Sequence, residues 1–249
     1  PPAVRSESSP GETLHRLLQV FFVLHRLGAD LGDPVEISQH AGDIEISAMG
    51  LSGGRQRQLR AAFRDIPSLT LRFDSGAPHG KAAREQSQSV QPGDTVGPTR
   101  LEAILGSAQA AEDFTDRALD ASDAMMARAH ALRALATAFG PAQEAALSAD
   151  DRNQLTEMRN EHATALTARA AELRAALRLV LGEIPAARGS ENIQEPWQFA
   201  SRKLFTAARQ FDDTLNREVA GGGAPNSDFG KLSAALVQLD RAMVALTGR

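Results

Sequence analysis

The sequence lacks several residue types and patterns that define large classes of protein. It contains no cysteine, so disulfides, thiolate metal sites and cysteine nucleophiles are excluded. Apolar runs stay far short of the ~18 residues of a membrane-spanning helix, and the longest candidate, residues 17–24, includes Gln19. Basic residues number 27 against 31 acidic ones, so no basic excess indicates nucleic acid as a partner.

Motifs of known catalytic chemistry are missing as well. Neither Gly53-Gly54 nor Gly221-Gly222-Gly223 continues into the Gly-Lys-Ser/Thr of a phosphate-binding loop. No serine lies in a Gly-x-Ser-x-Gly context, and no histidines are spaced as His-x-x-x-His or His-Glu-x-x-His. The sequence therefore predicts a protein that is not an enzyme and carries no cofactor and no metal.

The residues that are present predict an α+β protein of two domains. Over its 249 residues the composition is that of a globular protein, with 42% hydrophobic and 23% charged residues. Residues 75–98 are rich in Gly, Pro, Ser and Gln, and Val is their only large apolar residue type. Such a segment cannot offset its ordering entropy by burial, which predicts a flexible linker between residues 1–74 and 99–249.

The first domain has the pattern of a helix, a β-hairpin, a second helix and a third strand. Leucines at helical spacing follow Pro10, and two alternating runs, Val35–Ser38 and Ile44–Ala48, flank the turn residue Gly42. The alternation predicts that Val35, Ile37, Ile44 and Ile46 share one buried face of the hairpin.

This order resembles the BON domain, a small α-β-β-α-β module of bacterial envelope proteins, over roughly residues 12–73. The likeness rests on the hairpin Val35–Gly50, the helix Arg55–Asp65 and the short strand after Pro67. Where that family has Gly-Val before the last strand, this sequence has Ser68-Leu69. The resemblance implies a periplasmic location and binding at membranes or other envelope surfaces.

The second domain has the pattern of a mainly antiparallel four-helix region. Apolar stripes at helical spacing predict a first helix over residues 99–139 and a second that Ser148-Ala-Asp-Asp151 caps. The short break at Gly140–Ser148 predicts that these two form a long helical hairpin. A third helix is expected from Trp197, and Asp228 is expected to cap a fourth.

Three groups of residues are candidates for binding. Arg57, Arg60 and Arg64 share a face of the short helix and could meet anionic lipid or an acidic partner, although such a face is also typical of plain solvated surface. Folding the long hairpin could bring His130 near His162, with Glu161 and Asp123 completing a metal or proton-linked site. The alternative is that His162 is a partly buried polar residue that interrupts the apolar stripe of its helix, and that His130 lies on the surface. Trp197 is expected to anchor the bundle, or else to form an aromatic lip near residues 182–196.

The expected role is that of a non-enzymatic interaction or sensor region. The sequence begins Pro1-Pro2 without Met or a signal peptide, which suggests a processed piece whose upstream membrane segment was removed. The layout is similar to the extracytoplasmic region of membrane-anchored regulators such as anti-sigma factors. We therefore expect a periplasmic signalling module that binds a protein partner or an anionic lipid surface, and not nucleic acid. Two alternatives stay open: a ligand-binding protein or enzyme with a site between the domains, and a helical spacer that forms homo-oligomers through its long helices.

Overall fold

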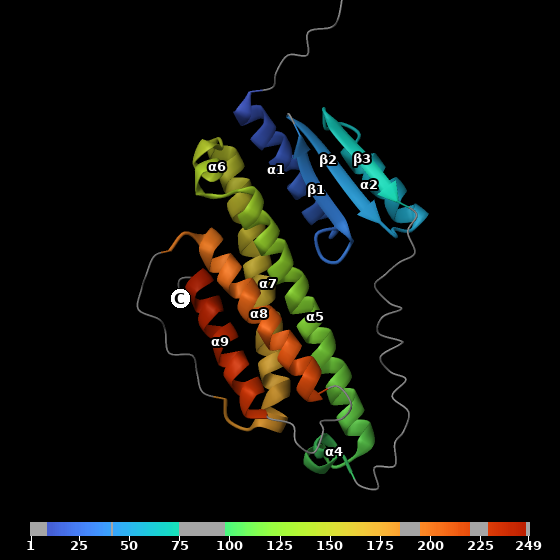
Figure 1. The fold of residues 1–249 in the computed structure, drawn as a ribbon, viewed down its shortest axis with the longest axis vertical. Helices are drawn as coiled ribbons and strands as arrows, with labels where there is room; N and C mark the ends of the chain where they lie inside the picture. Colours follow the sequence, from blue (N-terminus) through green and yellow to red (C-terminus); the bar gives the residue numbers. More distant parts are fainter. Residues whose placement is uncertain (1–8, 41, 75–97, 185–194, 220–228, 248–249) are drawn as a thin grey trace, which may run out of the picture. The chain divides into compact units, whose positions relative to one another are not determined.

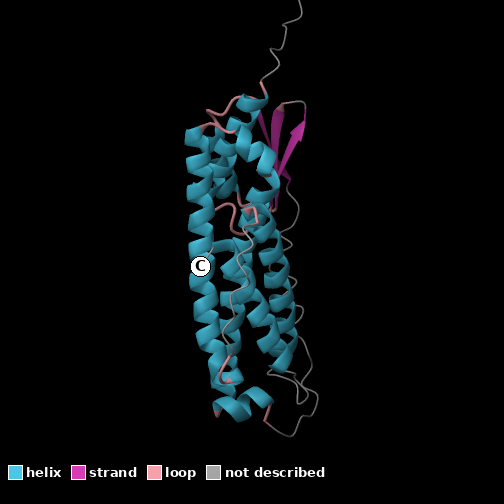
Figure 2. Cartoon of the chain, turned by 90° about the vertical axis from the view of Figure 1, so that its left-hand side faces the viewer, coloured by secondary structure: helices cyan, strands magenta, loops and turns pink. Residues whose placement is uncertain are grey.

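The structure, a computed structural model, describes residues 9–40, 42–74, 98–184, 195–219 and 229–247. These residues are mostly helical and contain one three-stranded sheet, which confirms the broad α+β class (Figure 2). The chain divides into two compact units. The first unit comprises Pro1–Gly93 and Ala142–Met158, and the second comprises Asp94–Pro141 and Arg159–Arg249. The expected linker, residues 75–98, lies outside the described residues except for its last position.

The N-terminal part of the first unit consists of a helix, two strands, a second helix and a third strand. Figure 1 shows them in blue and cyan. Serine side chains begin both helices, because a serine hydroxyl accepts one of the backbone N–H groups that the first turn leaves unsatisfied. Ser9 accepts from the N–H of Glu12 and Ser52 from that of Arg55. The elements are α1 (Pro10–Arg26), β1 (Val35–His40), β2 (Asp43–Met49), α2 (Gly53–Phe63) and β3 (Leu69–Asp74).

The sheet has the strand order β1-β2-β3 and one buried face. β1 and β2 are antiparallel, with Ile37 opposite Ile46, whereas β2 and β3 are parallel, with Ile46 beside Leu71. Ile44 and Ile46 are fully buried, and the next residues along each strand point to the other, polar face. There Arg72 pairs with Glu45 across the strands at 3.1 Å. The predicted sharing of one face by Val35, Ile37, Ile44 and Ile46 agrees with this register.

Residues 142–158 also belong to the first unit, although the sequence places them in the bundle. They hold most of a short helix, α6 (Pro141–Ala146), and the first turns of α7 (Ala149–Leu181). The sequence predicted only a break at Gly140–Ser148, so α6 was missed. The predicted cap of α7 is confirmed, because the Ser148 hydroxyl accepts from the N–H of Asp151 at 3.1 Å. His15 of α1 contacts the Asp151 carboxylate at 2.8 Å, which ties this segment to the first helix.

The second unit contains α4 (Arg100–Leu105), α5 (Ala108–Ala138), most of α7, α8 (Trp197–Val219) and α9 (Phe229–Thr247). The expected continuous helix over residues 99–139 is wrong. Gly106 has a left-handed backbone with φ of 88° and ends α4, and the Ser107 hydroxyl then caps α5 by accepting from Ala110 N–H. The sequence pattern missed this break because the apolar stripe continues through it.

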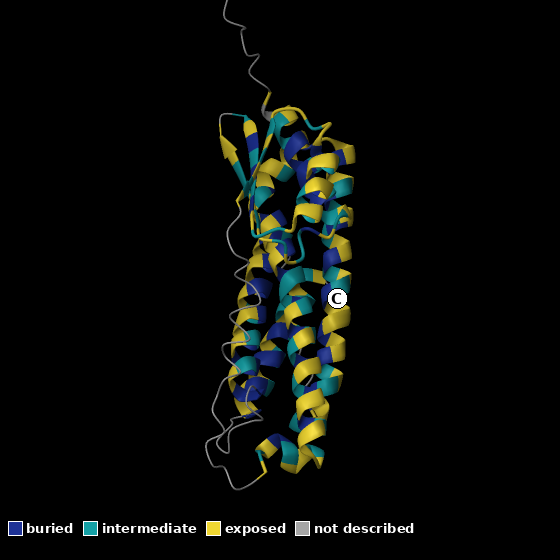
Figure 3. Ribbon diagram, turned by 90° about the vertical axis from the view of Figure 1, so that its right-hand side faces the viewer, coloured by how far each residue is buried: buried dark blue, intermediate teal, exposed yellow. Residues whose placement is uncertain are grey.

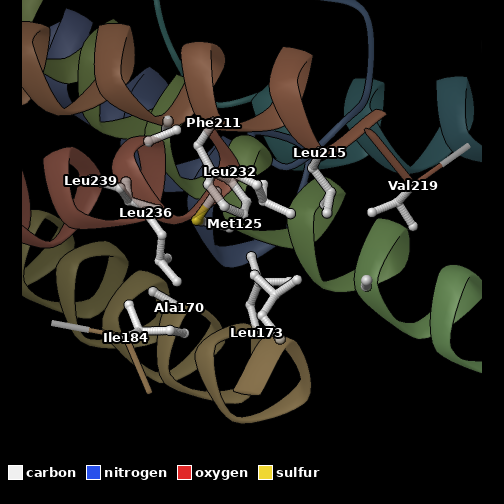
Figure 4. Packing of buried hydrophobic residues seen from close by; sticks show 14 of the residues in the cluster. Met125, Ala170, Leu173, Ile184, Phe211, Leu215, Val219, Leu232, Leu236 and Leu239 are labelled. Atoms are coloured by element: carbon white, nitrogen blue, oxygen red, sulfur yellow. The ribbon is translucent and has the colours of Figure 1, made fainter. Parts of the chain in front are cut away.

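One apolar cluster from five helices forms the core of the second unit. Figure 4 shows Met125 of α5 among Phe211 of α8 and Leu232 and Leu236 of α9, with Leu173 of α7 facing them. Buried and exposed residues alternate along the long helices, as amphipathic spacing requires (Figure 3). Leu101, Ala111, Phe114, Leu132, Leu166, Leu177, Leu204, Leu215, Val219 and Leu239 are further members of the cluster.

Candidate functional site

The three arginines singled out in the sequence lie exposed on α2 and at its end. Arg57 and Arg60 lie within the helix, Arg64 is its C-terminal cap, and all three side chains are exposed. Spacings of three and four residues place them on one side of the helix. No acidic residue lies between Gly53 and Arg64, so nothing within the helix offsets this charge. The arrangement is a short cationic face, which we call the arginine face.

Neighbouring groups hold two of these side chains without removing their charge. The Arg60 guanidinium lies over the Phe73 ring, 4.6 Å from its centroid, a cation–π contact that orients the group. Arg64 pairs with the next residue, Asp65, at 3.2 Å, and both side chains are largely exposed, which makes the pair weak. Arg57 has no ion-pair partner among the described residues. Arg55 differs from all three, because it pairs with Asp33 at 2.6 Å and donates to the Leu27 carbonyl.

The two histidines expected to meet lie against different neighbours within the second unit. The His130 ring packs edge-on against Phe205 of α8, with centroids 4.6 Å apart. His162 is 1% exposed, and its Nδ1 lies 3.4 Å from Nη1 of Arg128. Arg128 and His130 are two positions apart on α5, so their side chains do not share a face. Among the described residues, no group of three potential metal ligands contains His130.

Burial and positive neighbours both disfavour a proton on His130. Desolvation lowers the pKa of this imidazole most, and the charges of Arg133 and Arg209 lower it further. Arg133 also lies over the Phe205 ring at 4.4 Å, on the same aromatic group that His130 contacts. The surroundings therefore favour the neutral form of this exposed residue, which is a property of packing and does not require a ligand.

Trp197 begins α8 and is partly buried. The Arg159 guanidinium of α7 lies 5.6 Å from its ring centroid. The next residue, Gln198, is 2% exposed and donates from Nε2 to the Phe139 carbonyl at 3.0 Å, a tie between α8 and the end of α5 that the sequence analysis missed. Most of the loop that would form an aromatic lip with Trp197 lies outside the described residues.

The apolar strip that self-association would require is not found on α5. The large hydrophobic side chains exposed in the described part of the chain are Met49, Ile104, Leu179 and Phe199, and none of them belongs to that helix. Each lies on a different element of the fold. Single exposed apolar residues are normal on a protein surface, so they indicate no interface.

Sequence reasoning also missed a groove in the first unit. Its volume is about 490 Å³, and its lining includes Arg16, which is 7% exposed. The sequence did contain a sign of the helix start that borders the groove, because Ser9 and Glu12 have the spacing of a capping box at the start of α1. Nothing in the sequence distinguishes Arg16, which stands directly before the buried Leu17 and Leu18.

The interpretation of these groups of residues depends on their own chemistry. No helix in the described ranges has both the length and the apolar character needed to cross a membrane. No family model, no curated protein and no solved structure matches this chain.

Proposed function

We propose that this chain is a non-enzymatic, extracytoplasmic interaction region of a bacterial envelope protein, and that it binds an anionic membrane surface through the arginine face of α2. The observation that carries the proposal is the run from Gly53 to Arg64, an exposed helix with four arginines and no carboxylate. Each guanidinium near an anionic bilayer contributes about 1 kcal/mol of attraction at physiological salt. Three exposed arginines on one side would therefore give reversible binding that salt weakens.

The local structure of α2 supports a surface role. Leu59 and Phe63 are buried, so the orientation of the helix is determined, and Arg57, Arg60 and Arg64 are exposed to solvent. The stacking of Arg60 on Phe73 lowers the side-chain entropy that the guanidinium would lose on binding. Arg55 takes no part in the proposed contact, since Asp33 and the Leu27 carbonyl hold it against the body of the unit.

The element order of the first unit supports the envelope assignment. It is the helix, hairpin, helix and strand order on which the resemblance to the BON domain rests. In this proposal the parent protein is tethered by a membrane segment outside this sequence, and the helices of the second unit act in spacing or signalling. A protein partner with an acidic surface would use the same arginine face, so it is treated as an outcome of the test.

The test is co-sedimentation of the whole chain with vesicles at low salt. Vesicles of phosphatidylcholine with phosphatidylglycerol should bind the wild type, and pure phosphatidylcholine vesicles should not. The triple variant R57Q/R60Q/R64Q should bind the anionic vesicles at least ~10-fold more weakly, because about 1 kcal/mol is lost per charge. The matched control R178Q/R217Q/R241Q removes three exposed arginines from other helices, and we expect a change below ~2-fold.

Two results would reject lipid binding. One is a wild type that does not sediment with anionic vesicles at low salt. The other is an equal loss of binding in both triple variants, which would mean that net charge alone acts. Binding of an acidic protein that the α2 variant loses, without binding to vesicles, would assign the face to a protein partner instead.

A further inference from the structure

The groove of the first unit lies where α1 begins and where the chain enters β3. Its volume is about 490 Å³, it is open to solvent, and most of its surface is apolar. A volume of this size fits a small organic ligand or the end of a peptide. The residues that line it are Gly11, Glu12, His15, Arg16, Pro67 and Ser68.

Arg16 is a buried cation without a buried counter-ion. Its side chain donates only to neutral oxygens: from Nε to the Glu12 carbonyl, and from Nη2 to the Thr13 hydroxyl and the Gly42 carbonyl. No carboxylate pairs with it among the described residues, and Nη1 has no acceptor there. Burying a guanidinium is costly unless a negative charge compensates it, and here that compensation is missing.

The two other ionisable side chains of the groove are engaged elsewhere. The Glu12 carboxylate accepts from the N–H of Ser9 at 2.9 Å and completes the capping box, so one of its oxygens is engaged by the backbone and it forms no ion pair with Arg16. The two nitrogens of His15 meet Asp151 Oδ1 at 2.8 Å and Gln19 Nε2 at 2.9 Å. Arg16 is therefore the cation of the groove that has no ion-pair partner among the described residues.

The start of α1 adds a second donor to the same groove. Gly11 is in the first turn, where backbone N–H groups have no partner within the helix, and its own N–H has no described acceptor. The positive end of the helix dipole adds a favourable field for a negative charge. Residues 11 and 16 thus offer a backbone N–H and a guanidinium to one ligand.

We propose that this groove binds a carboxylate on an apolar body. One unpaired guanidinium matches one negative charge, and the nearby Glu12 carboxylate disfavours a ligand of higher charge such as a phosphate monoester. The apolar lining provides for the rest of the ligand. A free fatty acid and the C-terminal carboxylate of an apolar peptide both have this chemistry. The proposal does not depend on the arginine face, which lies on α2.

The first test is a titration of the ¹⁵N-labelled whole chain at pH 7, followed by NMR. Octanoate should shift the Gly11 amide and the Arg16 Nε–Hε signal saturably, with a Kd in the millimolar range or below. Octanamide, which has the same apolar chain and no charge, should bind at least tenfold more weakly. Acetyl-Ala-Leu-Leu with a free or an amidated C-terminus distinguishes a peptide end from a free acid.

A variant of Gly11 keeps the test independent of folding. A Cβ at this position would meet nothing within 4 Å, and an acidic residue in the first turn favours the helix. G11E adds a carboxylate to a residue that lines the groove, where it would repel an anionic ligand, so it should reduce octanoate affinity at least tenfold. G11Q has the same size without the charge and should reduce it less than threefold. R16Q should also lose binding, but it removes the contact with Gly42 and so tests folding as well.

Three outcomes would overturn the proposal. They are the absence of any shift up to 50 mM octanoate, equal shifts with octanamide, and equal affinities of G11E and G11Q. In each case Arg16 would be a structural residue that joins α1 to the hairpin turn. Vesicle binding by G11E should equal that of the wild type, so failure here leaves the arginine face untouched.

Discussion

Single residues in this protein owe their properties to partners that are distant in the sequence. His130 is an example: its ring packs against Phe205 of α8, and partial desolvation first and the charges of Arg133 and Arg209 second lower the pKa of its imidazole. In the unfolded chain the imidazole has the ordinary value of about 6.5. The unfolded state therefore binds the proton more readily than the folded state does. The contribution of His130 to the free energy of unfolding is therefore fully present above the unfolded-state pKa, and it is lost as the pH falls toward and through the lower pKa of the folded state.

Replacing His130 by Phe should flatten the pH dependence of stability. H130F keeps an aromatic ring against Phe205 and removes the titrating group. The free energy of unfolding should fall between pH 8 and pH 5.5 in the wild type, and it should fall less in H130F. Guanidinium titrations followed by the fluorescence of Trp197, which lies in the same unit, measure this. A variant that loses as much stability on acidification as the wild type would contradict the role assigned to burial and charge.

Gln198 is a second residue whose contact decides its role. We expect Gln198→Leu to destabilise the second unit by about 1–3 kcal/mol, since the buried hydrogen bond from Gln198 to the Phe139 carbonyl at the end of α5 would be removed. Gln210 is exposed on the same helix, so Q210L should change stability by less than about 0.5 kcal/mol. Chemical denaturation of both variants provides the comparison, and equal effects would rule out the hydrogen bond as the cause.

At the scale of elements, several helices begin at a serine or threonine whose capping role can be recognised in the sequence. Ser9, Ser52, Thr99 and Ser107 each accept from a backbone N–H three residues later. The first turn of α2 nevertheless contains two glycines, Gly53 and Gly54, which weaken a helix through their backbone entropy. The element that carries the arginine face is therefore held in place by Leu59 and Phe63 more than by its own propensity.

Gly54→Ala should stabilise α2 by about 0.5–1 kcal/mol. Its Cβ would meet only the Ser52 hydroxyl oxygen, at 3.9 Å, and the unfolded chain would lose freedom. The contrasting variant is Gly50→Ala, which should destabilise by more than about 1 kcal/mol because φ is 67° there. The first unit lacks Trp and Tyr, so amide hydrogen exchange across α2 is the suitable measurement. Slower exchange in G50A, or faster exchange in G54A, would contradict the helix account.

At the scale of the whole molecule, the first unit is assembled from two separate stretches of chain. Residues 142–158, which follow α5 in the sequence, belong to this unit. Within it, His15 contacts Asp151, which lies 136 residues later in the chain. A domain boundary placed at residues 75–98 on the basis of composition therefore leaves residues 142–158 out of the unit to which they belong. The chain order alone does not reveal that the N-terminal part includes a later helix.

A fragment of residues 1–93 should accordingly be less stable than the same residues within the whole chain. It lacks Asp151, and the amides of α1 should exchange faster in the fragment, measured by hydrogen exchange with mass spectrometry. The full-length variant D151N keeps the segment and weakens the His15 contact, at the cost of one acidic group in the first turn of α7, so its α1 amides should exchange at an intermediate rate. Identical protection of α1 in the fragment and the whole chain would show that residues 1–93 fold independently.

The sequence by itself determined most of the helices and strands and the shared face of the hairpin, but it missed the break at Gly106 and the short helix α6. Those properties follow from local periodicity and capping, as in the alternation around Gly42 and the cap at Ser148. The tertiary structure alone decided which distant side chains meet: Arg16 with Gly42, Gln198 with Phe139, and Arg174 with Asp240. It also separated the neighbours of His130 from those of His162 and buried Arg16 without a counter-ion. Such pairings depend on how whole elements pack, and a periodic pattern records only that a face is apolar, not which face it will meet.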